Sequence, residues 1–229
     1  MTAADFPRFR PVGDAALLVE FADRFEEAIH ARILDFDAAF AAHPLAGVRE
    51  CVPAYASVLL TYDPLVLSPQ AVIAHARWLV AMPAVAARSP AAHRIRVCYE
   101  PAFAPDLPEL AERLGLDPET IIDHHLAASY RVVAFGFAPG YAYLHGTPEA
   151  LRLPRKPAAR RDVPAGSVII AGSQCLVTTL TMPTGWWVIG ASPEALLPLD
   201  RDPPVLFGLG DSVRFARIDA AMLVAARAP

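Results

Sequence analysis

A short basic segment, RKPAARRDVPAG (155–166), holds the densest group of side chains in this sequence that could do chemistry. Four basic residues fall within seven positions: Arg155, Lys156, Arg160 and Arg161. Planar guanidinium groups bind carboxylates and phosphates through paired hydrogen bonds, so the segment could hold an anion. Because arginine supplies nineteen of the twenty basic residues of the chain, a cluster carries more weight than a lone arginine. A solvated basic loop fits the same letters equally well.

Glycine- and proline-rich segments lie on both sides of this basic stretch. GFAPGYAYLHG (136–146) combines tight-turn residues with three aromatic side chains, Phe137, Tyr141 and Tyr143. Rigid loops with aromatic walls form ligand rims on β scaffolds, although a hairpin with core aromatics is an equally good interpretation. VPAGSVIIAGSQ (163–174) places Gly/Ser turns at both ends of an apolar strand, where backbone N–H groups can line an anion site. Such turns are also common without any function.

His125 is the histidine best placed to act as an acid or a base. It follows Ile121 by four residues, so the two share one face of a predicted helix. A single histidine on an apolar helical face is more often a core residue than a catalytic one, and both interpretations stay open at this point. His124 cannot join His125 in chelating one metal ion, because adjacent helical residues point about 100° apart.

Several common catalytic sites are absent from the sequence. A phosphate-binding P-loop needs Gly-Lys-Ser/Thr, whereas the only lysine, Lys156, follows an arginine. The dinucleotide fingerprint GxGxxG, the zinc motif HExxH, the nucleophile elbow GxSxG and the EF-hand loop do not occur either. A serine–lysine amidase has little support, because Lys156 lies outside any Ser/Gly-rich stretch. We therefore expect no self-contained catalytic set and no metal site.

Composition indicates a folded chain in a reducing compartment. Hydrophobic residues make up 55% of the 229 positions and charged residues 19%, so disorder is not expected. The net charge of −4 gives no electrostatic reason to expect nucleic acid or a membrane as a partner. The three cysteines (Cys51, Cys98 and Cys175) form no CxxC pair, which favours the cytosol. We expect no secretory signal, because the N-terminus lacks a basic region followed by an apolar one.

The N-terminal part of the chain is predicted to alternate short strands and helices. Apolar residues at helical spacing predict a helix over 24–42, and Ser68-Pro69 is typical of a helix start. The predicted elements are strands at 9–12 and 15–21, the helix at 24–42, strands at 48–53 and 57–62, and a helix at 68–80. This ββαββα order favours an α+β sandwich with helices on one face of an antiparallel sheet.

The segment 82–92 (MPAVAARSPAA) is the predicted domain boundary, because it has two prolines and no periodicity. It separates a domain at residues 1–85 from one at residues 92–229. Proline supplies 23 of the 229 residues, which predicts many turns and short strands, as in a β-barrel or sandwich. The predicted elements are strands at 94–98, 130–137, 167–170, 176–181, 186–189 and 212–215, with helices at 108–114 and from 117.

Taken together and in order, long segments of the second domain resemble one family, that of the B subunit of ATP-dependent 5-oxoprolinase. This family is also called KipI-like, or the first subunit of allophanate hydrolase. The resemblance covers nearly all of residues 94–217, and GDAALLVEF (13–21) fits as well. The matching segments are YEPAFAPDLPELAERLGL (99–116), HHLAASYRVVAFGFAPGYAYL (124–144), RKPAARRDVPAGSVIIAGSQ (155–174), TMPTGWWVIGASP (181–193) and DPPVLFGLGDSVRF (202–215).

The resemblance implies a fold, a reaction and partners. The fold is α+β, with an N-terminal ferredoxin-like domain followed by a cyclophilin-like β-barrel domain that carries the site. The reaction is the ATP-dependent opening of 5-oxoproline to glutamate, with ADP and phosphate as the other products. The chain would be inactive without its partners, which are a larger KipA-like subunit (the C subunit of 5-oxoprolinase) and the A subunit. ATP would be shared with the partner subunit.

The resemblance also implies site residues, carried over position by position. His125, Arg161 and Gln174 are the expected catalytic residues, with the arginine holding a carboxylate or phosphate and the other two orienting a carbonyl or amide. The expected ligand-binding residues are Arg131, Phe137, Pro139, Gly140, Tyr143, Arg155, Gly166 and Ser167.

The sequence departs from the family pattern in two places. Ser173 replaces a second glycine before Gln174, and Cys175-Leu176-Val177 follows where the family has a further glycine. His145-Gly146 replaces a Gly-Gly pair after the aromatic loop. Both departures fall at the expected ligand rim, so they bear on the substrate rather than on the fold.

Two alternative functions come from other classes of protein. The first is a KipI-type inhibitor that blocks a sporulation histidine kinase by docking through the barrel domain. The arginine-rich, lysine-poor composition indicates a GC-rich bacterium that need not sporulate, which makes this alternative weaker. The second, a prolyl isomerase, rests only on the fold-level similarity of the barrel to cyclophilins.

Overall fold

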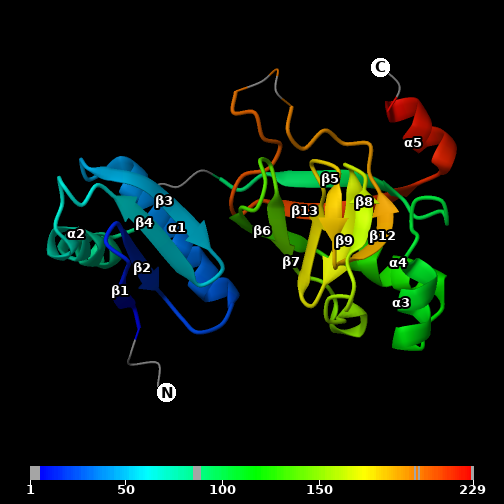
Figure 1. Ribbon diagram of the computed structural model, residues 1–229, viewed down its shortest axis with the longest axis horizontal. Coiled ribbons are helices and arrows are strands. Elements are labelled where there is room, and N and C mark those ends of the chain that lie inside the picture. Colours follow the sequence, from blue (N-terminus) through cyan, green and yellow to red (C-terminus); the bar gives the residue numbers. More distant parts are fainter. Residues whose placement is uncertain (1–5, 85–88, 199, 201, 228–229) are drawn as a thin grey trace. The chain divides into compact units, whose positions relative to one another are not determined.

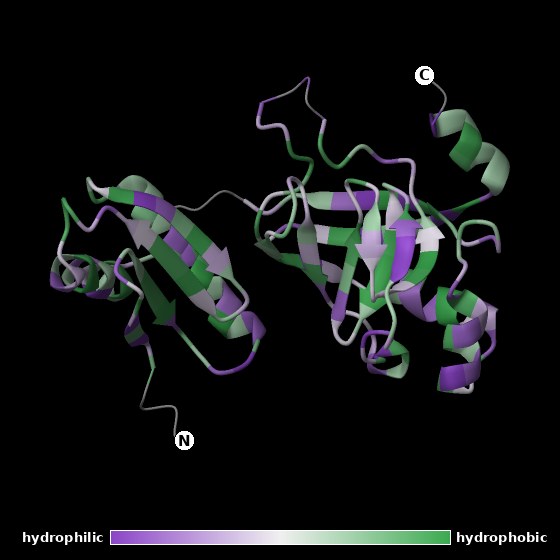
Figure 2. Ribbon diagram, in the orientation of Figure 1, coloured by the Kyte–Doolittle hydropathy of each residue, from purple (hydrophilic) through white to green (hydrophobic). Residues whose placement is uncertain are grey.

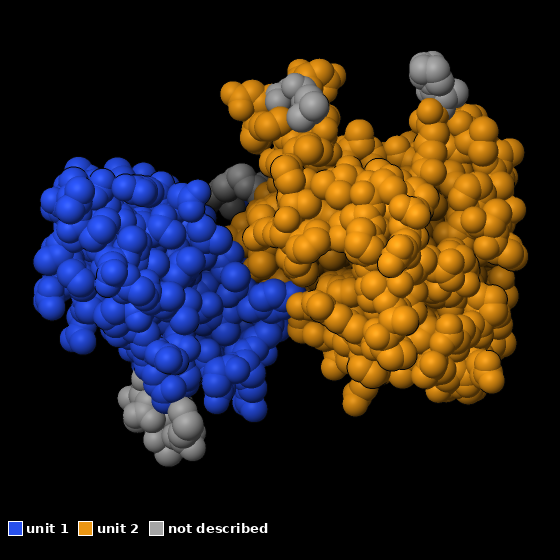
Figure 3. Space-filling model, viewed as in Figure 1, with its two compact units in different colours: residues 1–89 blue, residues 90–229 orange. Residues whose placement is uncertain are grey.

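The chain divides into two compact units, residues 1–89 (the N-terminal unit) and residues 90–229 (the barrel unit), coloured separately in Figure 3. The computed structural model describes residues 6–84, 89–198, 200 and 202–227. Part of the predicted boundary segment 82–92, namely residues 85–88, lies outside the described residues.

The N-terminal unit contains one antiparallel sheet and two helices in the predicted ββαββα order (Figure 1). The sheet order is β1-β2-β4-β3. Ser68 caps the second helix, as predicted, since its Oγ accepts a hydrogen bond from the N–H of Ala71 at 3.2 Å. The elements are β1 (Arg8–Val12), β2 (Ala16–Glu20), α1 (Glu27–Ala42), β3 (Val48–Ala54), β4 (Ser57–Tyr62) and α2 (Pro69–Ala81).

A single core holds this unit together. Every second side chain along β2 and β4 points into the core. Examples are Leu17 and Leu60, which are 1% and 0% exposed. Ile33 and Phe36 of α1 and Val72 of α2 pack into the same cluster. The helices therefore bury their apolar stripes against the sheet, as the periodicity of the sequence predicted.

The barrel unit is built on a closed barrel of seven strands. The strand order is β6-β13-β5-β12-β9-β10-β7, and β7 also pairs with β6, which closes the barrel. The pair β5–β13 is parallel, whereas the other pairs are antiparallel. The barrel strands are β5 (Ala92–Cys98), β6 (Tyr130–Phe135), β7 (Ala142–His145), β9 (Ser167–Ala171), β10 (Gln174–Val177), β12 (Trp187–Ala191) and β13 (Ser212–Ile218).

Alternation along the strands fills the barrel and builds a second cluster outside it. Val168 and Ile170 belong to the interior core, whereas Ile169 belongs to a separate cluster with Trp186 and Val163. Figure 2 shows this mixture of polar and apolar residues along the strands. Val163 comes from a two-stranded sheet of β8 (Arg160–Val163) and β11 (Met182–Thr184), so this small sheet contributes to the outer cluster.

Three helices and a short 3-10 turn complete the barrel unit. They are α3 (Leu107–Leu114), α4 (Pro118–Ala127), the 3-10 turn η2 (Glu149–Leu151) and α5 (Ala220–Arg227). Helices α3 and α4 contact each other, while α4 also contacts β13 (Figure 1). Asp117 caps α4 as expected for its Asp-Pro start, because its carboxylate accepts a hydrogen bond from the N–H of Thr120 at 2.9 Å. Across the described residues, no helix is long and apolar enough to cross a membrane.

Some elements of the barrel unit were not predicted from the sequence, or were predicted at other residues. The predicted strand 130–137 ends at Phe135, because Gly136 and Phe137 take positive φ values of 157° and 74°. The predicted strand 176–181 lies at 174–177 instead. Strands β7 and β8 and helix α5 were not predicted, and the two strands are only four residues long, too short for a clear alternation.

Candidate functional site

A cavity of about 310 Å³ opens beside β8 in the barrel unit. Its basic lining comes from Arg160 and Arg161 of β8 and from Arg227 at the end of α5. Ser167 and the acidic residue Asp162 also line it, while Phe103, Val188 and other apolar residues form the remaining wall. The volume falls within the usual range for small-molecule sites. A cavity with several guanidinium groups and an apolar wall suits a small organic anion.

The backbone of β8 is strained at this cavity. Asp162, between Arg161 and Val163, has a φ of 52°, in the left-handed region that residues other than glycine rarely adopt. Such a conformation costs about 1–3 kcal/mol and persists only where the surroundings impose it. Pairing with β11 at Val163↔Met182 and Arg160↔Thr184 supplies that constraint, and the register shifts between the two pairs.

Asp106 holds two of the four clustered basic side chains in an ion network around its buried carboxylate. Its carboxylate is paired with Lys156 and with Arg160, whose Nη2 donates to Oδ1 at 2.8 Å. The backbone N–H of Val188 donates to Oδ2 at 2.8 Å. Burial opposes ionisation of this carboxyl group, but the three donors outweigh it and hold its pKa below the ordinary value. Lys156 is therefore a structural cation, and Arg161 is left facing the cavity.

Sequence reasoning missed Asp106. It precedes Leu107-Pro108 at the start of α3, where an aspartate usually caps the helix. Its side chain makes no capping hydrogen bond, because it is turned toward Lys156 and Arg160 instead. In the sequence, the only sign of such a partner was the basic cluster itself, because Lys156 and Arg160 have no acidic residue beside them.

Gly166 and Ser167 form the turn at one edge of the cavity. The Ser167 hydroxyl donates to the carbonyl of Pro164 at 2.8 Å, and its N–H donates to Oγ1 of Thr178 at 2.9 Å. Gly166 has a φ of 81°, and a Cβ there would lie 2.6 Å from the carbonyl oxygen of Ser192. Both residues of the predicted ligand-binding set thus shape the turn, and the Ser167 hydroxyl is already engaged by the backbone.

A second group of predicted residues forms a row across three barrel strands. Arg131 of β6 lies opposite His145 of β7, which in turn lies opposite Gln174 of β10. Residues directly opposite each other project to the same face, and the next pairs, such as Val132↔Leu144, point into the barrel core. The row therefore lies on the outer face. Nη1 of Arg131 donates to the carbonyl of Gly210 at 3.0 Å.

Tyr143 and Arg155 meet at the outer cluster. The Tyr143 ring lies 6.1 Å from the Trp186 ring, and the Arg155 guanidinium lies 5.6 Å from the same Trp186 ring. Tyr143 is two residues before His145 on β7, so it shares the outer face of the row above. Two predicted ligand residues are thus brought together by a tryptophan that the sequence reasoning had not singled out.

The aromatic loop 136–141 carries the other predicted ligand residues. Phe137 is 74% exposed, and its ring lies 5.5 Å from the Tyr141 ring. The carbonyl of Pro139 accepts a hydrogen bond from the Thr179 hydroxyl at 2.8 Å. Gly140, with a φ of 72°, leaves room for the side chains of Thr179 and Leu197. The loop is therefore anchored at Pro139 while Phe137 faces solvent.

His125 lies in the barrel core, away from the cavity lining. The ring is 0% exposed, Nδ1 is hydrogen-bonded to the Tyr99 hydroxyl at 2.7 Å, and Nε2 lies 3.6 Å from Sγ of Cys175. The Phe215 ring lies 4.4 Å away, tilted by 30°. Burial lowers the pKa of His125 from 6.5 to about 3, so the ring is neutral near neutral pH. In this structure it has the surroundings of a core histidine.

The structure therefore divides the eleven predicted site residues among several places. Arg161 and Ser167 line the cavity, with Gly166 beside it, while Arg131, Tyr143, Arg155 and Gln174 belong to the outer barrel face and its cluster. His125 is in the core and the remaining three are in the aromatic loop. Among the residues that the structure describes, no group of three or more His, Cys, Asp or Glu side chains could hold a metal ion.

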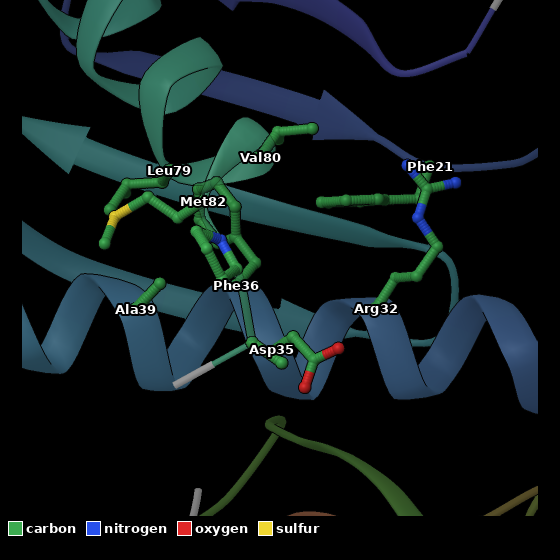
Figure 4. Close-up of a pocket in the computed structure, with 10 residues that line it drawn as sticks. Phe21, Arg32, Asp35, Phe36, Ala39, Leu79, Val80 and Met82 are labelled. Carbon is green, nitrogen blue, oxygen red and sulfur yellow. The ribbon is translucent and has the colours of Figure 1, made fainter. Parts of the chain in front are cut away.

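The N-terminal unit has a smaller cavity, of about 80 Å³, between α1 and the end of α2 (Figure 4). Phe21, Phe36 and Met82 line it, and the Arg32 guanidinium lies 5.3 Å from the Phe21 ring. Its volume is well below that of ordinary ligand sites. The cavity beside β8 is therefore the better candidate.

The chain is similar to proteins of one family. Residues 7–207 match the family described as carboxyltransferase domain, subdomain C and D. The B subunit of 5-oxoprolinase from Bacillus subtilis (strain 168) is 34% identical over 223 residues, which cover 90% of this chain and 91% of that protein. The B subunit of 5-oxoprolinase from Escherichia coli O157:H7 is 43% identical over 121 residues, covering 53% of this chain and 56% of that protein.

Solved structures give a similar result. The crystal structure of TTHA0988 matches with a TM-score of 0.79 and 36% identity, and the match covers 90% of this chain. It covers only 40% of that protein, so this chain spans less than half of its solved relative. The K. lactis urea amidolyase matches with a TM-score of 0.75 over 95% of this chain, and at 17% identity it supports the fold alone.

Proposed function

Because the chain belongs to the family of carboxyltransferase domains with subdomains C and D, we propose that it is a subunit of a 5-oxoprolinase. Its curated relatives with this name are 34–43% identical. The reaction would be the ATP-dependent hydrolysis of the lactam of 5-oxoproline to glutamate. The observation that carries the proposal within the structure is the basic cavity beside β8, because 5-oxoproline is a small organic anion with a carboxylate and an apolar ring.

In this proposal Arg161 holds the substrate carboxylate. Its neighbour Arg160 also lines the cavity, but its ion pair with Asp106 holds it in place. Arg160 therefore contributes positive charge near the ligand without binding it directly. Nη2 of Arg227 donates to the carbonyl of Ser192 at 2.8 Å, which likewise fixes the position of Arg227. Arg161 is an exposed residue of the cavity lining, and its guanidinium is the one suited to paired hydrogen bonds with a carboxylate.

Gln174 and His125 would act at a distance from Arg161. Gln174, in the row with His145 and Arg131, would contact an amide or carbonyl group presented at the outer barrel face. His125 would act as a positioning residue, because its hydrogen bond to Tyr99, just after β5, and its proximity to Cys175 of β10 link α4 to the barrel. The aromatic loop, with Phe137 exposed, would cover a ligand or a partner.

ATP and the remaining catalytic groups would come from partner subunits. The sequence contains no P-loop, and coupling to ATP is what makes the opening of a stable lactam favourable. We expect the chain to work with a larger KipA-like partner (the C subunit) and with the A subunit, and to be inactive alone. Its three cysteines are free thiols, which agrees with work in the reducing cytosol.

The fold names implied by the resemblance belong to the same proposal. The N-terminal unit has the antiparallel strand order β1-β2-β4-β3 and two helices. This order matches that of a ferredoxin-like sheet if β1, the first strand of the chain, occupies the edge position that the last strand has in that fold. The closed seven-stranded barrel supports the cyclophilin-like assignment. We propose domains at residues 1–85 and 92–229, limits that agree with compact units at 1–89 and 90–229.

Reconstitution tests the proposed function. The chain is co-expressed with its partner subunits, and glutamate release from 5-oxoproline is followed with and without ATP. We expect release that requires ATP and every subunit. A well-assembled complex without turnover would contradict the proposal, and capture of a sensor kinase by the same chain would then favour the inhibitor function.

A further inference from the structure

The parallel pair β5–β13 brings two arginines side by side outside the cavity described above. Arg94 of β5 is in register with Arg214 of β13, and both side chains are exposed. Neighbouring strands lie about 4.8 Å apart, so the two side chains start from adjacent positions on one face of the sheet. Like charges placed directly opposite each other destabilise a sheet unless a counter-charge compensates them.

Neither arginine finds that counter-charge within the described parts of the chain, where both lack an ion pair and a side-chain hydrogen bond. The next arginines along the same two strands do have partners. Arg96 of β5 donates to Glu194 at 2.7 Å, and Arg217 of β13 donates to Glu119 at 2.5 Å. The arginines at 94 and 214 are thus exceptions on otherwise neutralised strands.

The two guanidinium-bearing residues line a cavity of about 480 Å³. Its other walls include Leu126 of α4, Phe215 and the polar residue Ser212. The nearby carboxylate of Asp211 is buried, and it accepts hydrogen bonds from the N–H groups of Ala91 and Gly208, both at 2.7 Å. This carboxylate is occupied in holding the loop and does not replace an external counter-anion.

We infer that Arg94 and Arg214 bind a phosphate group. Two unpaired guanidinium ions match the charge of one phosphate dianion, whereas a single carboxylate would leave one positive charge uncompensated. The cavity is large enough for an organic phosphate, whose apolar part would lie against Leu126 and Phe215. This site shares no lining residue with the cavity of Arg161, so it does not depend on the proposed function.

Isothermal titration of the full chain with inorganic phosphate and, separately, with ATP tests the inference at low ionic strength. We expect both probes to bind at one site. Equal affinities would assign recognition to the phosphate group alone, whereas tighter binding of ATP would assign an organic phosphate. R94Q and R214Q should each weaken binding about tenfold or more, the loss expected for one charge-assisted contact.

R96Q is the matched control, because it removes the same charge from the same strand, where the guanidinium is already paired with Glu194. Its affinity for phosphate should stay within about twofold of the wild type, and circular dichroism should show all three variants folded. Absence of binding by both probes at millimolar concentration would overturn the inference. An equal loss in R96Q would overturn it too, since it would indicate general charge attraction rather than a site.

Discussion

At the scale of single residues, Asp106 decides which basic side chains of segment 155–166 can meet a ligand. It binds Lys156 and Arg160 and leaves Arg161 to the cavity. The sequence alone could not separate these side chains, because all of them look alike in a basic cluster. What distinguishes them is a carboxylate about fifty positions earlier in the chain, which becomes their partner only when α3 packs beside β12.

Replacement of Asp106 should be costly. D106N removes the charge that compensates Lys156, whose side chain is only 9% exposed, and we expect a loss of about 3 kcal/mol in the free energy of unfolding. The pKa of Asp106 is lowered by folding, so its contribution is present above the ordinary value of 3.8 and is lost as pH falls through the lower folded pKa. Urea unfolding measures this, with E109Q as the exposed control on α3. A loss in D106N no larger than that in E109Q would refute the buried network.

His125 makes a prediction about pH. Its pKa falls from 6.5 in the unfolded chain to about 3 in the folded one, so the unfolded state takes up a proton first as the pH is lowered. As the pH is lowered from 6.5 to about 3, the free energy of unfolding should decrease, and this group should contribute up to about 1.4 kcal/mol per pH unit to the decrease. The free energy of unfolding of H125Q should depend less steeply on pH than that of the wild type. H124Q, which changes an exposed position on the same helix, should keep the pH dependence of the wild type. Equal slopes in H125Q and the wild type would show that the ring is not buried in neutral form.

At the scale of elements, the turn between β8 and β9 fixes the edge of the Arg161 cavity. Gly166 has a positive φ, and a Cβ would lie 2.6 Å from backbone oxygen. Gly172, at the other end of β9, also has a positive φ, of 55°, but a Cβ there meets nothing within 4 Å. A side chain at either position would therefore strain the backbone, but only at Gly166 would it also clash with neighbouring atoms.

This difference predicts the outcome of two matched substitutions. G166A should lower the free energy of unfolding by about 2 kcal/mol more than G172A does, because only the former forces backbone atoms apart. Thermal unfolding of the two variants measures the difference. Equal losses would mean that the turn moves easily and does not fix the edge of the cavity.

The elements also show how far sequence reasoning reaches. Strands and helices with long periodic patterns, such as α1 and β4, were predicted within a few residues, because one buried face imposes the pattern. The row of Arg131, His145 and Gln174 could not be predicted, since it depends on the pairing of β6, β7 and β10 across a closed barrel. His145 had been noted only as a departure from the family, and the barrel places it in the middle of that row.

At the scale of the whole molecule, the chain belongs to the family of carboxyltransferase domains with subdomains C and D, and its proposed role is that of one subunit of a 5-oxoprolinase. The family predicted from the sequence is confirmed by the match over residues 7–207 and by the curated relatives. The chain spans 40% of TTHA0988, so in the proposed complex we expect additional domains or subunits to supply further catalytic groups. The predicted site residues split among several places, which suits a surface that is completed by a partner.

Steady-state kinetics of the reconstituted complex test the central claim, that the cavity of Arg161 holds the carboxylate of 5-oxoproline. R161Q should lower kcat/KM for 5-oxoproline by about 10- to 100-fold, the loss expected for a charge-assisted hydrogen-bonding group, while the subunits still assemble. R113Q, which removes an exposed arginine paired with Glu109 on α3, should leave kcat/KM unchanged. An assembled R161Q complex with the wild-type kcat/KM would contradict the account.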